Sequence, residues 1–132
     1  MEEARPSIEQ DGDAAALAVL EYAAGEIGLI RVQNGAALAA FTRAMQHARQ
    51  AGELWLEASS RGWAAAAMAM GPTPRAEALR WLEDAEAQSA TYQPYLVGWR
   101  AYILAELGRF DEARPLLTES LAQMKERGCG YR

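Results

Sequence analysis

The sequence predicts an all-α protein built from helical hairpins. Residues that favour helices, chiefly Ala, Leu, Glu, Arg, Gln and Met, dominate between about residues 13 and 127, whereas Val, Ile and Thr are scarce. In addition, a pattern of small, bulky apolar and small residues at i, i+4 and i+7 recurs three times. Its members are Ala37, Phe41 and Ala44, then Ala78, Leu82 and Ala85, then Ala113, Leu117 and Ser120. The first two occurrences start 41 residues apart and the last two 35, a spacing typical of stacked supersecondary units.

Short clusters of turn residues divide the chain into six predicted helices. These helices span about residues 13–33, 36–51, 53–70, 74–89, 94–107 and 111–127. Gly52 and Gly108 follow two of the predicted helix ends, where glycine is favoured. We expect Asn34, Thr73 and Asp111 to cap the helices that follow them, because their side chains can accept hydrogen bonds from free N–H groups.

The six helices are expected to form three antiparallel pairs in a single domain over residues 12–127. The three repeats would span about 12–51, 53–89 and 94–127. Small residues let two helix axes approach closely while the bulky residue between them fills the opposite groove, so the pairs should stack. Residues 1–11 contain little apolar surface and are expected to form a flexible arm, and residues 128–132 a flexible tail.

Composition argues against several classes of partner and location. The formal net charge is −5 and there is no run of Lys or Arg, so we expect no nucleic acid partner. No apolar stretch approaches the roughly 20 residues that span a bilayer, so we expect no membrane partner either. A single cysteine, Cys129, excludes an intramolecular disulfide. Together with the lack of a secretory signal pattern, this predicts a cytoplasmic protein with an incidental thiol.

One segment carries a resemblance to a known family. The run Leu107-Gly108-Arg109-Phe110-Asp111-Glu112-Ala113-Arg114-Pro115-Leu116-Leu117 is similar to the turn and second helix of many bacterial tetratricopeptide (TPR) repeats. The Ala-rich helices resemble the repeat regions of large bacterial regulatory ATPases and transcriptional activators. The resemblance implies a short right-handed α-solenoid. The first helix of a TPR repeat usually carries a Trp, a Leu-Gly pair and a Tyr at fixed spacing. Of these, only the small central residue is kept, as Gly25, Ala66 and Ala101. An ordinary helical bundle is the alternative fold.

The resemblance also implies where a partner would bind. In TPR proteins the first helix of each pair lines a concave face, which suits a peptide or helix with apolar or basic anchors. The matching residues form an aromatic, mildly acidic wall. We predict partner contacts at Tyr22, Glu26, Trp63, Met70, Tyr95, Tyr102 and Glu106. The alternative is that the aromatic residues simply pack between repeats.

No residue constellation in the sequence supports catalysis. His47 is the only histidine, so a triad or a multi-histidine metal site would need another chain. Glu83, Asp84 and Glu86 are close together, but acidic clusters on Ala-rich helices are usually solvated faces. The glycines form no phosphate-binding loop. We therefore expect a noncatalytic protein that has no cofactor and no metal site and acts as an interaction scaffold or adaptor.

Two other functions remain open. The last helix has no successor, yet it carries apolar residues at helical spacing, so a homodimer could form through the final hairpin. We predict self-association at Leu117, Leu121 and Met124. A third interpretation is a small-molecule sensor whose pocket is lined by Trp63, Met70 and Tyr102.

Overall fold

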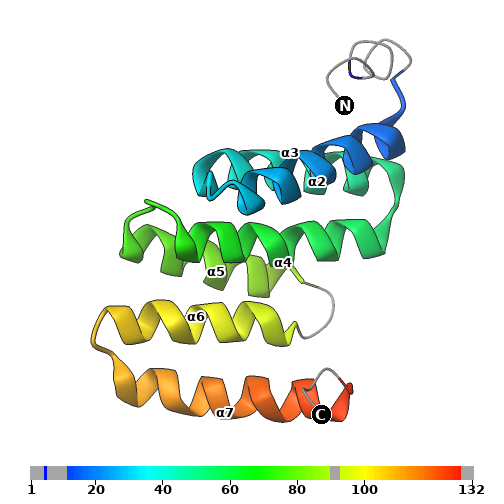
Figure 1. Cartoon of the computed structure of the whole chain (residues 1–132). Helices are drawn as coiled ribbons and strands as arrows, with labels where there is room; N and C mark the ends of the chain where they lie inside the picture. Colours follow the sequence, from blue (N-terminus) through cyan, green and yellow to red (C-terminus); the bar gives the residue numbers. More distant parts are fainter. Residues whose placement is uncertain (1–4, 6–11, 90–92, 129–132) are drawn as a thin grey trace. The chain divides into compact units, whose positions relative to one another are not determined.

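The protein is all-helical in the part of the chain that the structure describes. The computed structural model describes residues 5, 12–89 and 93–128. These ranges contain six helices and no strand (Figure 1). The helices are α2 (Ala14–Ile30), α3 (Asn34–Ala51), α4 (Leu54–Met70), α5 (Arg75–Gln88), α6 (Pro94–Glu106) and α7 (Phe110–Glu126). Each predicted helix is therefore present, with small displacements of its ends.

The chain divides into two compact units, Met1–Pro72 and Thr73–Arg132. In the first unit α3 packs against both α2 and α4 (Figure 1). Ala18, Ala48 and Leu56, one from each helix, form a buried cluster against which the half-buried Tyr22 packs. Phe41 of α3 is completely buried, because its ring lies directly against Gly25 of α2 and meets the ring of Tyr22 edge to face.

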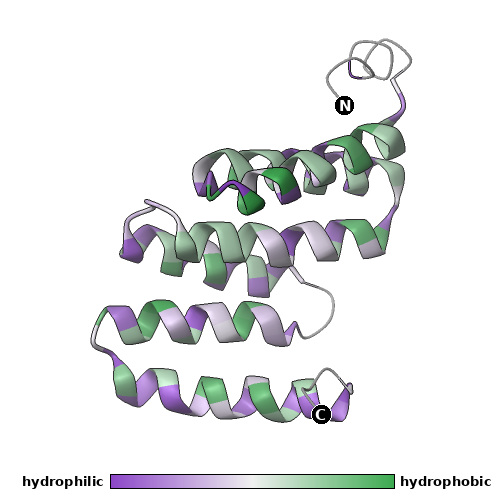
Figure 2. Cartoon of the chain, in the orientation of Figure 1, coloured by the Kyte–Doolittle hydropathy of each residue, from purple (hydrophilic) through white to green (hydrophobic). Residues whose placement is uncertain are grey.

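The second unit is built around α6, which packs against both α5 and α7. Its largest fully buried side chains are Leu82, Leu96 and Ile103. A buried hydrogen bond joins α7 to the start of α6, where the Ser120 hydroxyl donates to the carbonyl of Pro94 at 2.7 Å. Along α7, hydrophilic and hydrophobic residues alternate, as expected for a helix with one packed side (Figure 2).

The repeated pattern of small and bulky residues is buried in two of its three occurrences. All of its members on α3 and α5 are buried, including Phe41 and Leu82, which have no exposed surface. On α7 the small residues Ala113 and Ser120 are also buried, but the bulky Leu117 between them is 43% exposed. The third occurrence therefore packs only through its small residues.

The predicted helix caps at Asn34, Thr73 and Asp111 are wrong. Helix α3 follows Gln33, and Asn34 instead donates its side-chain N–H to the carbonyl of Met70 at 3.0 Å. Pro74 takes an extended conformation and is itself the residue before α5, so Thr73 lies one position too early to cap it. Asp111 lies in the first turn of α7, where a carboxylate is favourable to the helix dipole, but the helix begins earlier.

Packing confirms two of the three predicted hairpins, α2 with α3 and α6 with α7. The third predicted pair, α4 with α5, is divided between the two units and stays a prediction, as do the single domain and the right-handed solenoid. The expected arm and tail, with Cys129, lie almost entirely outside the described residues. In the described ranges, no helix combines the length and the apolar character required to cross a bilayer.

Candidate interaction surfaces

In the first unit, two of the predicted contact residues lie on one face of α4. Trp63 is 44% exposed and Met70 is 50% exposed, and their spacing of seven residues places them two turns apart on the same side. Glu26, on α2, is also exposed. Large apolar side chains of this kind are enriched at protein interfaces, so this face of α4 is suited to contact a partner.

Tyr22, the remaining predicted residue of this unit, is integrated into the packing of the helices. Its hydroxyl is hydrogen-bonded to the hydroxyl of Ser59 on α4 at 2.9 Å. Its ring meets Phe41 of α3 edge to face, with 5.6 Å between centroids. These contacts fit the alternative in which Tyr22 packs between helices, and a direct role for it in partner binding stays a prediction.

In the second unit the predicted residues gather along α6. Tyr95 is 54% exposed and Tyr102 is 44% exposed, again seven residues apart on one side of the helix. Trp99 lies between them in sequence, and its ring meets that of Tyr102 edge to face at 5.7 Å. The sequence-based site omitted Trp99, although its position one turn before Tyr102 could have identified it.

Glu106 organises the polar end of this aromatic surface. The guanidinium of Arg75, at the start of α5, donates to the Glu106 carboxylate at 2.8 Å. The hydroxyl of Tyr102 also donates to Glu106, and this hydrogen bond and the carboxylate's negative charge raise the pKa of Tyr102 above its usual value. Arg75 was not predicted, because no sequence spacing links it to α6. The result is a neutral phenol held beside an ion pair.

A buried carboxylate in α2 was also missed. Glu21 has only 2% of its side chain exposed, and it forms ion pairs with Arg5 and, at 3.0 Å, with Arg43 of α3. Burial raises the pKa of Glu21, but the hydrogen bonds and positive charges of the two arginines outweigh it, so the pKa lies below its usual value. The available signal was the position of Glu21 between the apolar residues Leu20 and Tyr22. Its geometry indicates a structural role.

The predicted self-association residues lie together on α7. Leu117 is 43% exposed, Leu121 is 57% exposed and Met124 is half-buried. Phe110, seven residues before Leu117, belongs to the same side of the helix and is 57% exposed. The last helix therefore has an apolar side that is largely exposed, and self-association through it stays a prediction.

The described residues hold no group of three or more His, Cys, Asp or Glu side chains that could bind a metal ion. His47 is half-buried on α3, and its Nδ1 has no hydrogen-bond partner in the described part of the chain. The three residues of the predicted sensor pocket are divided between the units, with Trp63 and Met70 in the first and Tyr102 in the second. A shared pocket therefore stays a prediction.

Comparisons with known proteins identify no relative of this chain. No family model matches it, and no curated protein or solved structure is significantly similar to it. The similarity to TPR repeats therefore rests on the residues quoted above, and the function must be argued from the chain's own surfaces.

Proposed function

We propose that this chain is a noncatalytic protein–protein interaction module that binds a peptide or a helix of another protein. The proposal rests mainly on the partial exposure of large interface-type side chains along α4 and α6. Trp63, Met70, Tyr95 and Tyr102 are each between 44% and 54% exposed. Such side chains give a large contact area at a low entropic cost, and aromatic residues and Met are enriched in interfaces.

The α6 surface has the mixture of groups that recognition requires. Trp99 and Tyr102 supply apolar area, while Glu106 and Arg75 supply a fixed polar end. The edge-to-face packing of the two rings restricts their rotation before a partner arrives, which reduces the entropy lost on binding. A peptide with an apolar anchor next to a hydrogen-bonding group would complement this arrangement.

Three repeats arranged as a TPR-like right-handed solenoid form part of the same proposal. It is supported by the recurrence of the small and bulky pattern and by the packing of α2 with α3 and of α6 with α7. A cytoplasmic location is also proposed, because a chain with one cysteine needs no oxidising compartment for an internal disulfide.

Native mass spectrometry of the chain purified from its own host tests the interaction function. We expect a stoichiometric protein or peptide to be retained by the wild-type chain and lost from Trp63→Ala or Tyr102→Ala. Gln46→Ala, at an exposed position of α3, is the control and should retain the partner. A partner held equally by all four proteins would contradict the proposed surfaces, and a chain that retains none would contradict the function.

A further inference from the structure

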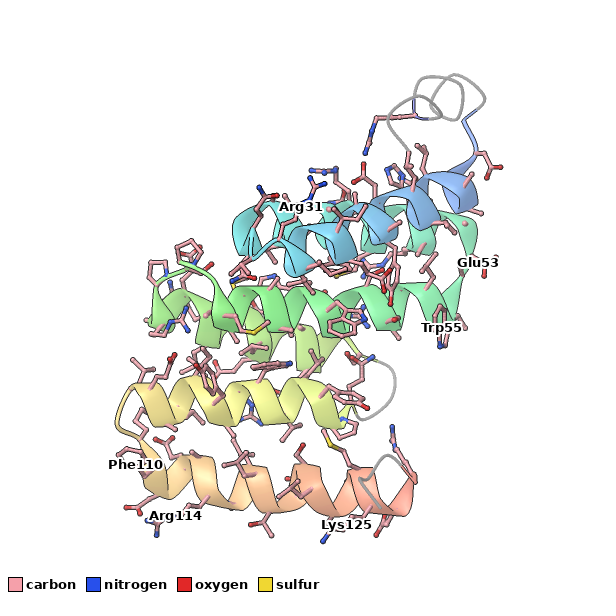
Figure 3. All side chains as sticks on the ribbon, in the orientation of Figure 1. Arg31, Glu53, Trp55, Phe110, Arg114 and Lys125 are labelled. Atoms are coloured by element: carbon pink, nitrogen blue, oxygen red, sulfur yellow. The ribbon has the colours of Figure 1, made fainter. Side chains whose placement is uncertain are left out.

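The uncovered apolar side of α7 is a continuous stripe. Its residues, spaced by seven, four and three positions along the helix, are Phe110, Leu117, Leu121 and Met124. The first three are 57%, 43% and 57% exposed, whereas Phe41 and Leu82, which occupy the position of Leu117 in the other two occurrences of the repeat, are completely buried. The stripe is bordered by Arg114 and Lys125, which project from the side of α7 that points away from α6 (Figure 3).

The residues of α3 that correspond to this stripe show which kind of element can cover it. Each residue of the α7 stripe has a counterpart 76 residues earlier, on α3, just as Ala113 has Ala37. These counterparts are Asn34, Phe41, Met45 and Ala48. On α3 the two ends of this side lie against α4, because Asn34 donates to the carbonyl of Met70 and Ala48 packs with Leu56. Between them, the ring of Phe41 packs against Gly25 of α2. A helix is therefore the element that this pattern accommodates.

An ion pair also joins α3 to α4. Arg49, beside the α3 stripe, donates to the carboxylate of Glu57 on α4 with N···O distances of 2.8 and 3.0 Å. Lys125 is the residue 76 positions after Arg49, and it borders the α7 stripe in the same place. Lys125 and Arg114 are both exposed, and neither forms an ion pair with any described residue. Lys125 thus occupies the position of Arg49 without a paired carboxylate among the described residues.

We propose that α7 docks an amphipathic helix of another protein, which packs its apolar side on Phe110, Leu117 and Leu121 and sets a carboxylate against Lys125. This surface shares no residue with the proposed contact residues of α4 and α6, so the inference does not depend on the proposed function. A second copy of the chain fits less well. In a symmetric antiparallel pair centred between Leu117 and Leu121, Arg114 of one copy would lie near Lys125 of the other, and like charges would repel.

A peptide with the sequence of residues 53–70, which includes Glu57, is a suitable probe. In the first unit these residues contain α4, the helix that packs against α3. Fluorescence anisotropy would measure its binding to the full chain. We expect Leu121→Glu to weaken binding by more than about tenfold, because it places a charge in the apolar contact. Lys125→Glu should weaken it about fivefold, and a peptide with Glu57→Lys should restore the affinity. Arg80→Glu makes the same charge change at an exposed position of α5 and should have no effect.

Three results would overturn the proposal. The first is no binding of the peptide to the wild-type chain. The second is binding that Leu121→Glu leaves unchanged, since the peptide would then occupy another surface. The third is a chain that sedimentation shows to be dimeric and that Leu121→Glu converts to a monomer, because the stripe would then be covered by a second copy. Circular dichroism of each variant verifies that the helices remain formed.

Discussion

A Cβ atom on Gly25 would lie only 2.7 Å from the ring of Phe41. Gly25 is in the middle of α2, where glycine is unfavourable by about 1 kcal/mol relative to alanine. Its presence is explained by α3, whose Phe41 ring lies directly against the α2 backbone and has no exposed surface. The contact between α2 and α3 therefore depends on the missing side chain at Gly25.

Gly25→Ala should destabilise the protein even though alanine is the better helix former. The buried ring of Phe41 must shift to accommodate the methyl group, and overpacking of this kind typically costs about 1–3 kcal/mol. Gly62→Ala is the matched control, because nothing lies within 4 Å of a Cβ at that position of α4. It should stabilise the protein by up to about 1 kcal/mol. Urea unfolding measures both changes, and equal shifts in the two variants would contradict this account.

Val32→Gly should stabilise the protein. Val32 has φ 58°, in the left-handed region that a β-branched residue rarely adopts, whereas Gly52, Gly108 and Gly128 occupy this conformation after other helices. Glycine removes a strain of about 1–2 kcal/mol, part of which is offset by the greater freedom of the unfolded chain. We expect a net gain of about 0.5–1 kcal/mol and a rise of about 2–3 °C in the melting temperature.

Gly52→Val is the reciprocal control. It creates at the end of α3 the strain that Val32 produces at the end of α2, so it should lower the melting temperature. Because Val32 is 78% exposed, Val32→Gly removes little packing. A decrease in melting temperature for Val32→Gly would show that the valine side chain makes a stabilising contact that outweighs its backbone strain.

Glu21→Gln should remove part of the pH dependence of stability. The pKa of Glu21 is lower in the folded protein than its usual value of 4.5, so the ionised carboxylate stabilises the fold above that pH. This contribution is lost as the pH falls through the depressed folded pKa. At pH 7 we expect Glu21→Gln to be less stable than the wild type by about 1–3 kcal/mol, because Arg5 and Arg43 lose a charged acceptor.

Urea unfolding between pH 7 and pH 3 would test the Glu21 prediction, since the difference between wild type and Glu21→Gln should shrink toward the acidic end. Glu26→Gln changes an exposed carboxylate on the same helix and serves as the control. If the difference stayed constant over this range, ionisation of Glu21 would not be coupled to folding.

The helices could be predicted because their signals are local. Glycines and prolines mark most helix ends, and Ala37, Phe41 and Ala44 share one side of α3 at a spacing fixed by helix geometry. Leu117 shows where such a signal fails. Its spacing matches that of Phe41, but exposure depends on whether another helix covers the position, and no pattern within α7 contains that information.

The polar contacts were less predictable because they join distant segments. Arg75 and Glu106 are 31 positions apart, and Tyr22 and Ser59 are 37 apart. Asn34 has the residue type of a helix cap, yet its amide reaches the carbonyl at the end of α4. Local propensity describes what such a side chain can do, whereas tertiary packing decides which hydrogen bond it makes.

Glu106→Gln should lower the pKa of Tyr102 toward 10.0, its ordinary value. In the wild type the phenol donates to the Glu106 carboxylate, and ionisation would replace that hydrogen bond with repulsion between two anions. Ultraviolet difference titration measures tyrosinate formation, and subtraction of the Tyr102→Phe curve in each background isolates this residue. Glu77→Gln, at an exposed position of α5, is the control and should leave the Tyr102 titration unchanged. If Tyr102 titrated identically with and without the Glu106 carboxylate, its hydroxyl would be free to rotate, and the polar end of the α6 surface would not be organised before a partner binds.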